Sequence, residues 1–174
     1  MAELFVEMLA QARNSLGRTE EAVELVLAQP ERIEELYQCY FQPNEWVRLR
    51  ASSAFKRIWR RQVTLFLPYL TRFVDDISLI DQPSVRWTFA QLCLDLDAHL
   101  SASQRVTCVQ RLQGYLQSTD DWIVQNTTVE TLGTWARRDE SLRRWLCPRL
   151  TVLVAQGRKS VAKRAAGWLE RLGD

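Results

Sequence analysis

The chain of 174 residues contains one histidine, and nucleophilic catalysis is the chemistry that this residue could serve. Asp95 precedes His99 and Ser101 follows it, which supplies the residue types of a hydrolase triad but no oxyanion hole. A histidine at the end of a helix more commonly bonds the last carbonyl groups of that helix. One histidine also excludes a multi-histidine metal site. We therefore expect no catalytic residue, no metal ligand and no cofactor.

Three aspartates that are close in sequence could hold a hard cation. They are Asp75, Asp76 and Asp81. Their spacing is not that of an EF-hand loop, so we expect solvated carboxylates in a loop.

The four cysteines lie far apart, without a Cys-x-x-Cys pair, and each is surrounded by apolar residues. They are Cys39, Cys93, Cys108 and Cys147. This usage is typical of free, buried thiols in a reducing compartment. Glu3 and Glu7 interrupt the start that a secretory signal needs, and no apolar run approaches the roughly 18 to 20 residues that cross a bilayer. We expect a cytoplasmic protein with no membrane partner.

The charge of the chain nearly cancels, with 23 basic and 21 acidic residues, but basic side chains are concentrated in two zones. The first zone is Arg50, Arg57, Arg60 and Arg61, and the second is Arg143, Arg144, Arg149, Arg158, Lys159, Lys163 and Arg164. A phosphate-binding groove would need both zones to join, because affinity grows with the number of phosphates neutralised. The equivalent positions between the zones are neutral or acidic. Nucleic-acid binding through the two zones is therefore the alternative function rather than the preferred one, and we expect it to be weak.

The segments that must position these side chains form a repeat. Four valines each begin a segment with apolar or small residues at offsets of 4, 7, 8 and 11, and they are Val47, Val85, Val124 and Val161. The valines are 38, 39 and 37 residues apart, a period expected of two-helix solenoid units. Because the offsets describe one stripe of a helix, each valine is predicted to be buried in a second helix.

An apolar segment precedes each second helix and is predicted to be the first helix of the unit. Two of these first helices contain a proline, Pro68 or Pro148, which should bend them. The sequence predicts no strands and helices near 2–15, 19–28, 31–41, 45–61, 63–79, 84–98, 102–117, 121–137, 140–155 and 159–172. We expect one domain over 1–174, in which 1–28 form an N-terminal cap and 29–172 form four helical repeats.

The pattern Asp-x-x-Val-Arg-x-x-Ala-x-x-Ala-Leu-Gly, preceded by a proline-bent helix, resembles HEAT repeats, and residues 121–133 match it most completely. The resemblance covers about 30–172 and implies an all-α, right-handed superhelix of about four two-helix repeats. It also implies an inter-repeat polar ladder at Arg48, Arg86 and Gln125. Arrays of this kind usually serve as scaffolds that present a concave surface to a protein or a nucleic acid.

The DNA alkylation-repair glycosylases are enzymes among the HEAT-like arrays, and residues 45–48 resemble the start of one of their helices. This distant similarity implies concave aromatic residues, a carboxylate that stabilises a developing sugar cation, and basic side chains on the phosphates. A tryptophan with an aspartate one helical turn later occurs only as Trp135 and Asp139, and Asp139 falls beyond the predicted helix. We therefore expect a protein that is not an enzyme.

The function that we expect is that of a non-catalytic interaction module or scaffold for a protein partner. The candidate partner-binding residues are Arg50, Arg57, Arg61, Trp87, Asn126, Glu130 and Arg164. At least two of four tryptophans, Trp46, Trp59, Trp87 and Trp122, are expected on one contiguous surface, since exposed aromatics beside arginine often anchor protein contacts. Self-association is a third expectation, because the first forty residues are acidic and the last forty are basic.

Overall fold

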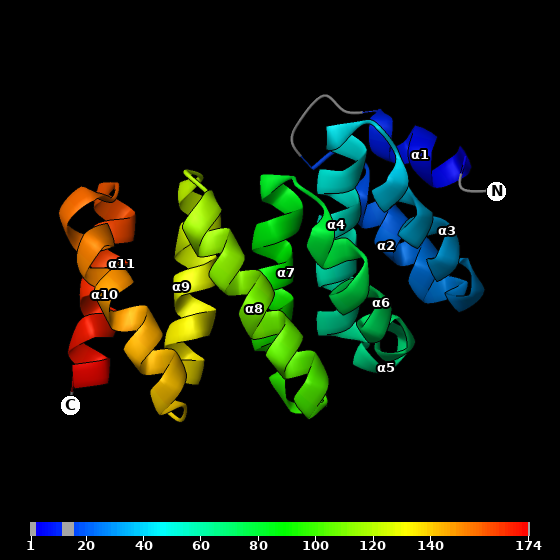
Figure 1. Cartoon of the computed structure of the whole chain (residues 1–174). Coiled ribbons are helices and arrows are strands. Elements are labelled where there is room, and N and C mark those ends of the chain that lie inside the picture. The colour runs from blue at the N-terminus through cyan, green and yellow to red at the C-terminus, as the bar shows by residue number, and fades with distance from the viewer. Residues whose placement is uncertain (1–2, 12–15, 174) are drawn as a thin grey trace. The chain divides into compact units, whose positions relative to one another are not determined.

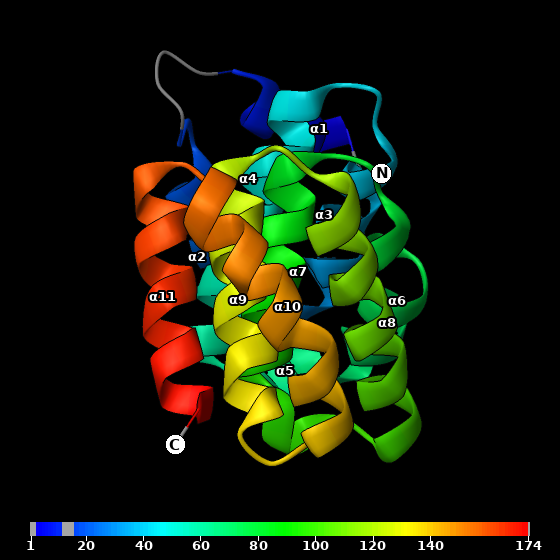
Figure 2. The same ribbon diagram turned by 60° about the vertical axis from the view of Figure 1, so that its left-hand side comes forward.

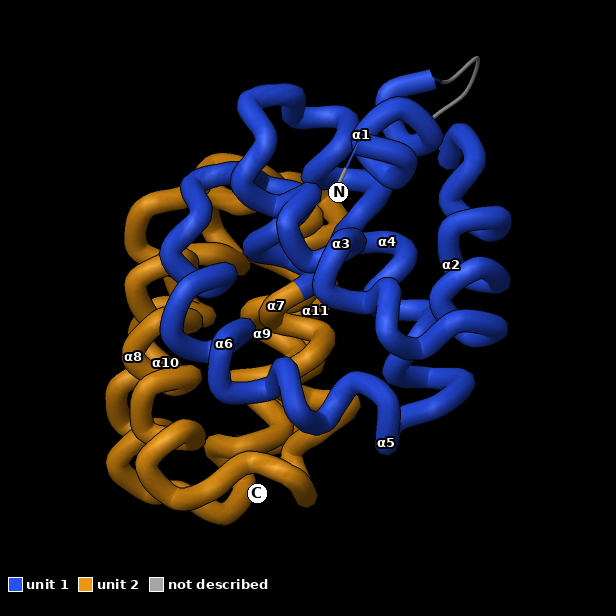
Figure 3. The backbone as a smooth tube through the Cα atoms, turned by 90° about the vertical axis from the view of Figure 1, so that its right-hand side faces the viewer, with its two compact units in different colours: residues 1–88 blue, residues 89–174 orange. Residues whose placement is uncertain are grey.

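A computed structural model describes residues 3–11 and 16–173, and all regular structure over these residues is helical (Figure 1). The prediction of an all-α chain is confirmed. None of the helices in the described ranges is both long and apolar enough to traverse a bilayer. The chain divides into two compact units, residues 1–88 and 89–174, which Figure 3 colours separately. The single domain expected over 1–174 stays a prediction.

Helix α4 is the element around which unit 1 packs. It contacts α1, α2, α5 and the turn before it, and it begins where the Asn44 side chain accepts a hydrogen bond from the Trp46 amide. Its buried stripe includes Val47, Ala51 and Phe55. The helices of unit 1 are α1 (Glu3–Ala10), α2 (Thr19–Ala28), α3 (Ile33–Gln38), α4 (Glu45–Arg61), α5 (Val63–Phe66) and α6 (Leu70–Asp75).

The core of unit 1 is a cluster of aromatic rings from consecutive helices. Phe55 of α4 lies with its ring centroid 5.0 Å from that of Phe73 on α6, and Phe73 lies 4.9 Å from Phe66 on α5. Tyr40 stacks on Phe55 with a centroid distance of 5.8 Å. Edge and stacked contacts of this kind add to the burial of the rings, so they fix how the short helices lie against α4.

A bidentate ion pair ties α3 to α6 at the edge of this core. Both carboxylate oxygens of Glu34 accept from the Arg72 guanidinium, at 2.5 and 3.0 Å, and Gln38 and Tyr69 donate to the same carboxylate. The guanidinium of Arg72 also lies over the Tyr37 ring, 3.8 Å from its centroid. The hydrogen bonds from Arg72 lower the pKa of Glu34 to about 2.

Helix α9 (Trp122–Ala136) is the central element of unit 2 and contacts α8 (Ala102–Ser118), α10 (Glu140–Gln156) and α11 (Lys159–Gly173). Figure 2 shows these four helices from the side on which α10 lies. Side chains cap the starts of α8, α9 and α10: Ser101 and Gln104 form a capping box at α8, and Asp121 and Asp139 accept amide hydrogen bonds at α9 and α10. Helix α7 (Pro83–Asp95) begins in unit 1 and ends in unit 2.

The four repeat valines occupy the same position in four helices. Val47, Val85, Val124 and Val161 are the third residues of α4, α7, α9 and α11, and each is at most 1% exposed. Their predicted burial in second helices is confirmed. In each of these four helices the valine is the first residue of the apolar stripe. The period of the sequence therefore fixes where each helix begins.

The first helices of unit 2, α8 and α10, match the predicted ranges 102–117 and 140–155 to within one residue, whereas those of unit 1 follow the prediction less closely. In unit 1, Pro68 lies in a 3-10 turn, Leu67–Tyr69, that separates α5 from α6, whereas Pro148 lies inside a continuous α10. The segment predicted as one helix over 31–41 is the short α3 between two 3-10 turns. The helix predicted over 2–15 ends at Ala10 in α1, and 12–15 lie outside the described residues. A proline lacks the N–H that continues a helix, which explains the break at Pro68 but not the continuity at Pro148.

Polar side chains at the second helices link the turns. Arg48 donates to the side chain of Gln82, in the turn before α7, and Gln82 donates to the Glu45 carbonyl at 2.9 Å. The equivalent residues bond within their own turns, since Arg86 pairs with Asp81 and Gln125 donates to the Thr119 carbonyl. The polar ladder is thus an inter-repeat contact at Arg48, while the contacts seen at Arg86 and Gln125 are local.

The cysteines are free thiols, as expected, and three of them, Cys39, Cys93 and Cys108, are completely buried. Cys147 is half-buried. Burial raises the pKa of Cys39 to about 12 and also raises that of Cys93. These thiols therefore serve as small apolar core residues.

Candidate interaction site on helices α9 and α11

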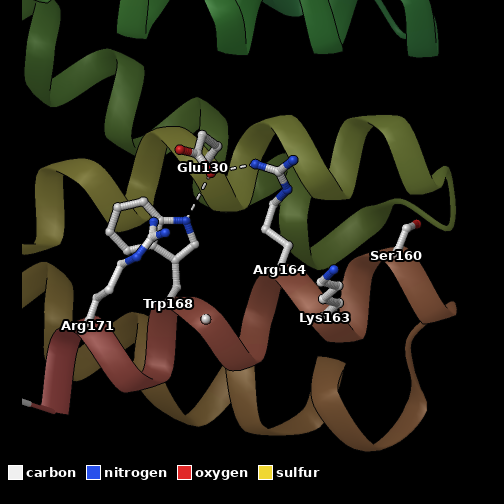
Figure 4. A pocket seen from close by; sticks show the side chains of 7 residues that line it. Glu130, Ser160, Lys163, Arg164, Trp168 and Arg171 are labelled. Carbon is white, nitrogen blue, oxygen red and sulfur yellow. Dashed lines mark hydrogen bonds and ion pairs between the residues drawn. The ribbon is translucent and has the colours of Figure 1, made fainter.

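A stripe of α11 forms one wall of a cavity of about 500 Å³ in unit 2 (Figure 4). The stripe follows the spacing of one helix face, and Glu130 of α9 faces it. The residues of this α9–α11 cleft are Glu130, Ser160, Lys163, Arg164, Gly167, Trp168 and Arg171.

Glu130 is the centre of the hydrogen bonds in the cleft. One of its carboxylate oxygens accepts from the Trp168 indole nitrogen at 3.1 Å and from Arg164 at 2.5 Å, as Figure 4 shows. Asn126, one turn earlier on α9, accepts from Arg164 Nε at 3.0 Å and donates to the Ser160 hydroxyl at 3.3 Å. Three candidate residues from the sequence, Asn126, Glu130 and Arg164, therefore lie in one network.

The cleft carries an excess of positive charge. It contains the cations of Lys163, Arg164 and Arg171 but only the carboxylate of Glu130, which pairs with Arg164. Over 3–11 and 16–173, no ion pair engages Lys163 or Arg171. The Arg171 guanidinium instead lies over the Trp168 ring, 4.9 Å from its centroid. Two cations thus remain available to an anionic ligand.

Gly133 explains how the Trp168 ring reaches its place. A Cβ added at Gly133 would lie 2.7 Å from Cε2 and 2.8 Å from Cε3 of Trp168, far inside ordinary contact distance. The absence of a side chain on α9 thus lets the ring lie flat against this helix, with its N–H directed to Glu130. Trp168 lies seven residues after Val161, at an apolar offset of the repeat, and it is both 4% exposed and part of the cleft.

The candidate arginines of the first basic zone are engaged within unit 1. The prediction that Arg50 is an exposed contact residue is wrong: it is 4% exposed and donates to the Leu9 carbonyl at the end of α1. Burial lowers its pKa. Arg57 pairs with Glu20, and Arg61 pairs with Glu20 and Glu24, so both hold α2 against α4. The acidic residues of α2 thus neutralise Arg57 and Arg61, for which the sequence alone indicated no partner.

The tryptophans that were expected at the surface differ in exposure. Trp46 and Trp122 are 48% and 41% exposed, whereas Trp59 is buried against Phe66. Trp46 and the half-buried candidate Trp87 line one cavity of about 230 Å³ in unit 1, at the starts of α4 and α7. Trp87 is not exposed, and the exposed Trp46 and Trp122 lie in different units, so the expectation of two exposed tryptophans on one contiguous surface stays a prediction.

The described residues offer no group of three His, Cys, Asp or Glu side chains suited to a metal ion. Asp76 accepts a hydrogen bond from Tyr37, and Asp81 pairs with Arg86. The chemistry that the α9–α11 cleft can perform is recognition of negative charge beside an indole ring.

No protein-family model matches the chain, and no curated protein sequence is significantly similar to it. The resemblance to HEAT repeats therefore stays a prediction.

Proposed function

We propose that the chain is a non-catalytic binding module that takes an acidic segment of a partner protein in the α9–α11 cleft. The observation that carries this proposal is the network of Asn126, Glu130 and Arg164. The flanking cations, Lys163 and Arg171, form no ion pair with any residue of 3–11 and 16–173. The cleft is aromatic and cationic, a combination enriched at the contact residues of protein interfaces.

The spacing of the two cations suggests the form of the ligand. Lys163 and Arg171 are eight residues apart on α11, which is about 12 Å along the helix axis. An extended peptide covers that distance in about four residues. Two carboxylates separated by three residues would therefore meet both cations at once.

We further propose that the helices form a right-handed superhelix of about four HEAT-like repeats with an N-terminal cap. The equal positions of the four valines in α4, α7, α9 and α11 support this architecture, as does their period near 38 residues. In such arrays the second helices form the binding surface. The α9–α11 cleft lies on two of them.

The test is binding of a fluorescein-labelled peptide with two glutamates separated by three residues, followed by anisotropy at about 0.15 M salt. We expect Lys163→Glu and Arg171→Glu each to weaken binding about tenfold, because each replaces attraction by repulsion. Arg144→Glu is the matched control, since it makes the same charge change on α10, outside the cleft, where Arg144 is 76% exposed. Equal affinities of the wild type and both cleft variants would contradict the proposal.

A steric variant separates the cleft from general electrostatics. A Cβ at Gly167 meets nothing within 4 Å, so Gly167→Leu adds a side chain to the cleft without changing charge. Gly114 on α8 is equally open and lies outside the cleft, so Gly114→Leu is its control. We expect the peptide to lose affinity for the Gly167 variant alone.

Nucleic-acid binding is the second candidate, favoured by the contact of Glu130 with Trp168. A carboxylate, a tryptophan and basic side chains are the combination that similarity to the alkylation-repair glycosylases implies. The Glu130 oxygen that accepts from Trp168 also accepts from Arg164, and Arg57 and Arg61 of the first basic zone pair with acidic residues of α2. We therefore expect duplex DNA to bind non-specifically, with a Kd of about 10⁻⁴ to 10⁻⁶ M. Submicromolar binding that Lys163→Glu abolishes would favour this second candidate.

A further inference from the structure

A second cavity in unit 2 lies near the C-terminal end of α9 and is lined by three arginines. It encloses about 350 Å³ and is lined by Asp97, Arg105, Thr134, Trp135, Arg137 and Arg138. None of these residues lines the α9–α11 cleft. Its function would be independent of the one proposed for the cleft.

The cavity has a net positive charge. Asp97 pairs with Arg105, whereas within the described part of the chain Arg137 and Arg138 have no ion-pair partner and are exposed. Three guanidinium groups and one carboxylate leave two positive charges uncompensated. A ligand with two negative charges would balance them, while a single carboxylate would not.

The ring of Trp135 forms part of the cavity wall and holds one of the arginines. The guanidinium of Arg105 lies over this ring, 4.5 Å from the centroid, and pairs with the Asp97 carboxylate. Because Trp135 is only 2% exposed, its ring is fixed by packing. The Arg105 guanidinium is therefore held in place before a ligand binds.

We propose that this cavity binds a phosphate monoester, held by Arg105, Arg137 and Arg138. A phosphate monoester carries nearly two negative charges at neutral pH and three strong acceptor oxygens. Guanidinium groups recognise such oxygens through paired, charge-assisted hydrogen bonds. The volume exceeds the need of the phosphate group alone and leaves room for the group that carries it.

Isothermal titration calorimetry of the full chain tests the proposal with phenyl phosphate and, as the charge control, benzoate. We expect phenyl phosphate to bind at least about tenfold more tightly than benzoate, because only the dianion balances both free charges. Arg138→Gln should weaken phenyl phosphate about tenfold, whereas Arg144→Gln, which removes an equal charge on α10 outside the cavity, should leave it unchanged. Equal loss in both variants would overturn the proposal, as would no heat up to about 10 mM phenyl phosphate.

Two further ligands distinguish the source of the phosphate. A phosphoserine peptide that binds no more tightly than phenyl phosphate supports a free small molecule, and one that binds at least about tenfold more tightly supports a phosphorylated partner. In both cases the phosphorylated ligand should bind more tightly than its unphosphorylated form, and Arg138→Gln should remove this difference in affinity. A single-stranded oligonucleotide, which has diester phosphates, that binds more tightly than either monoester would overturn the proposal.

Discussion

Gly133 is a single residue on which the geometry of the cleft depends. In Gly133→Ala, the added methyl group would lie inside contact distance of the Trp168 ring, so the ring would have to shift. We expect a loss of about 1–3 kcal/mol in the free energy of unfolding, as for other overpacked cores. The hydrogen bond from Trp168 to Glu130 should also be lost. Denaturant unfolding and the indole N–H signal of Trp168 in NMR spectra measure the two effects.

Gly114→Ala is the control for this substitution. Gly114 lies within α8 and a Cβ there meets nothing, so alanine should stabilise the chain by about 0.5–1 kcal/mol through its higher helix propensity. If Gly133→Ala also stabilised the chain, the close contact with Trp168 would be disproved.

The Glu34–Arg72 ion pair predicts a pH dependence of stability. The pKa of Glu34 is lowered from 4.5 to about 2, so its pairing stabilises the fold above the unfolded pKa and is lost as pH falls from about 4.5 to 2. Both side chains are more than a third exposed, so solvent screening makes the contribution small. Urea unfolding of the wild type and of Glu34→Gln, compared at pH 6 and at about pH 2.5, measures it.

We expect the wild type to be the more stable protein at pH 6 and the difference to shrink at the lower pH. A difference that stays constant over this range would mean that Glu34 does not titrate with the pair. Other carboxylates lose their charge over the same range, which is why the variant serves as the reference.

At the level of the helices, the sequence predicted most second helices and the first helices of unit 2 well, and the first helices of unit 1 poorly. Helix α4 spans the predicted range of 45–61, and α9 and α11 end within one residue of theirs. Strong start signals, such as Asn44 and Asp121, made these helices recognisable. The first helices of unit 1 contain short 3-10 turns that depend on how aromatic rings pack around Phe73, and such long-range packing leaves no periodic pattern.

Helix α9 offers the clearest test of the repeat core. Leu132 is completely buried between helices of unit 2, so Leu132→Ala should lower the free energy of unfolding by about 2–5 kcal/mol. Leu79→Ala, at a leucine that is 58% exposed, should cost less than about 1 kcal/mol. Denaturant unfolding compares the two, and similar small losses would mean that α9 does not pack as described.

At the level of the whole chain, the candidate site was only partly predictable. The sequence identified Asn126, Glu130 and Arg164, because second-helix positions are the usual contact positions of repeat arrays. It did not identify Trp168, because an aromatic residue at an apolar position of the repeat is expected in the core. The spacing of 160, 163, 164, 167, 168 and 171 could nevertheless have shown that these residues share one face of the helix.

The charge distribution shows why the sequence of a basic zone alone does not reveal whether its side chains are available to a partner. Arg57 and Arg61 find their partners on α2, more than thirty residues away, so a basic segment becomes an internal contact. The same ion pairs neutralise some of the acidic side chains among the first forty residues. Fewer negative charges therefore remain for self-association than the composition suggested.

The buried cysteines can report the local opening of each of the two units. A maleimide can reach a thiol only after the surrounding packing opens, so the rate of alkylation measures that event. Cys39 lies in unit 1, and Cys93 and Cys108 lie in unit 2, while the half-buried Cys147 should react first. Mass spectrometry of partially alkylated protein would therefore reveal, without any engineered label, which unit opens more often.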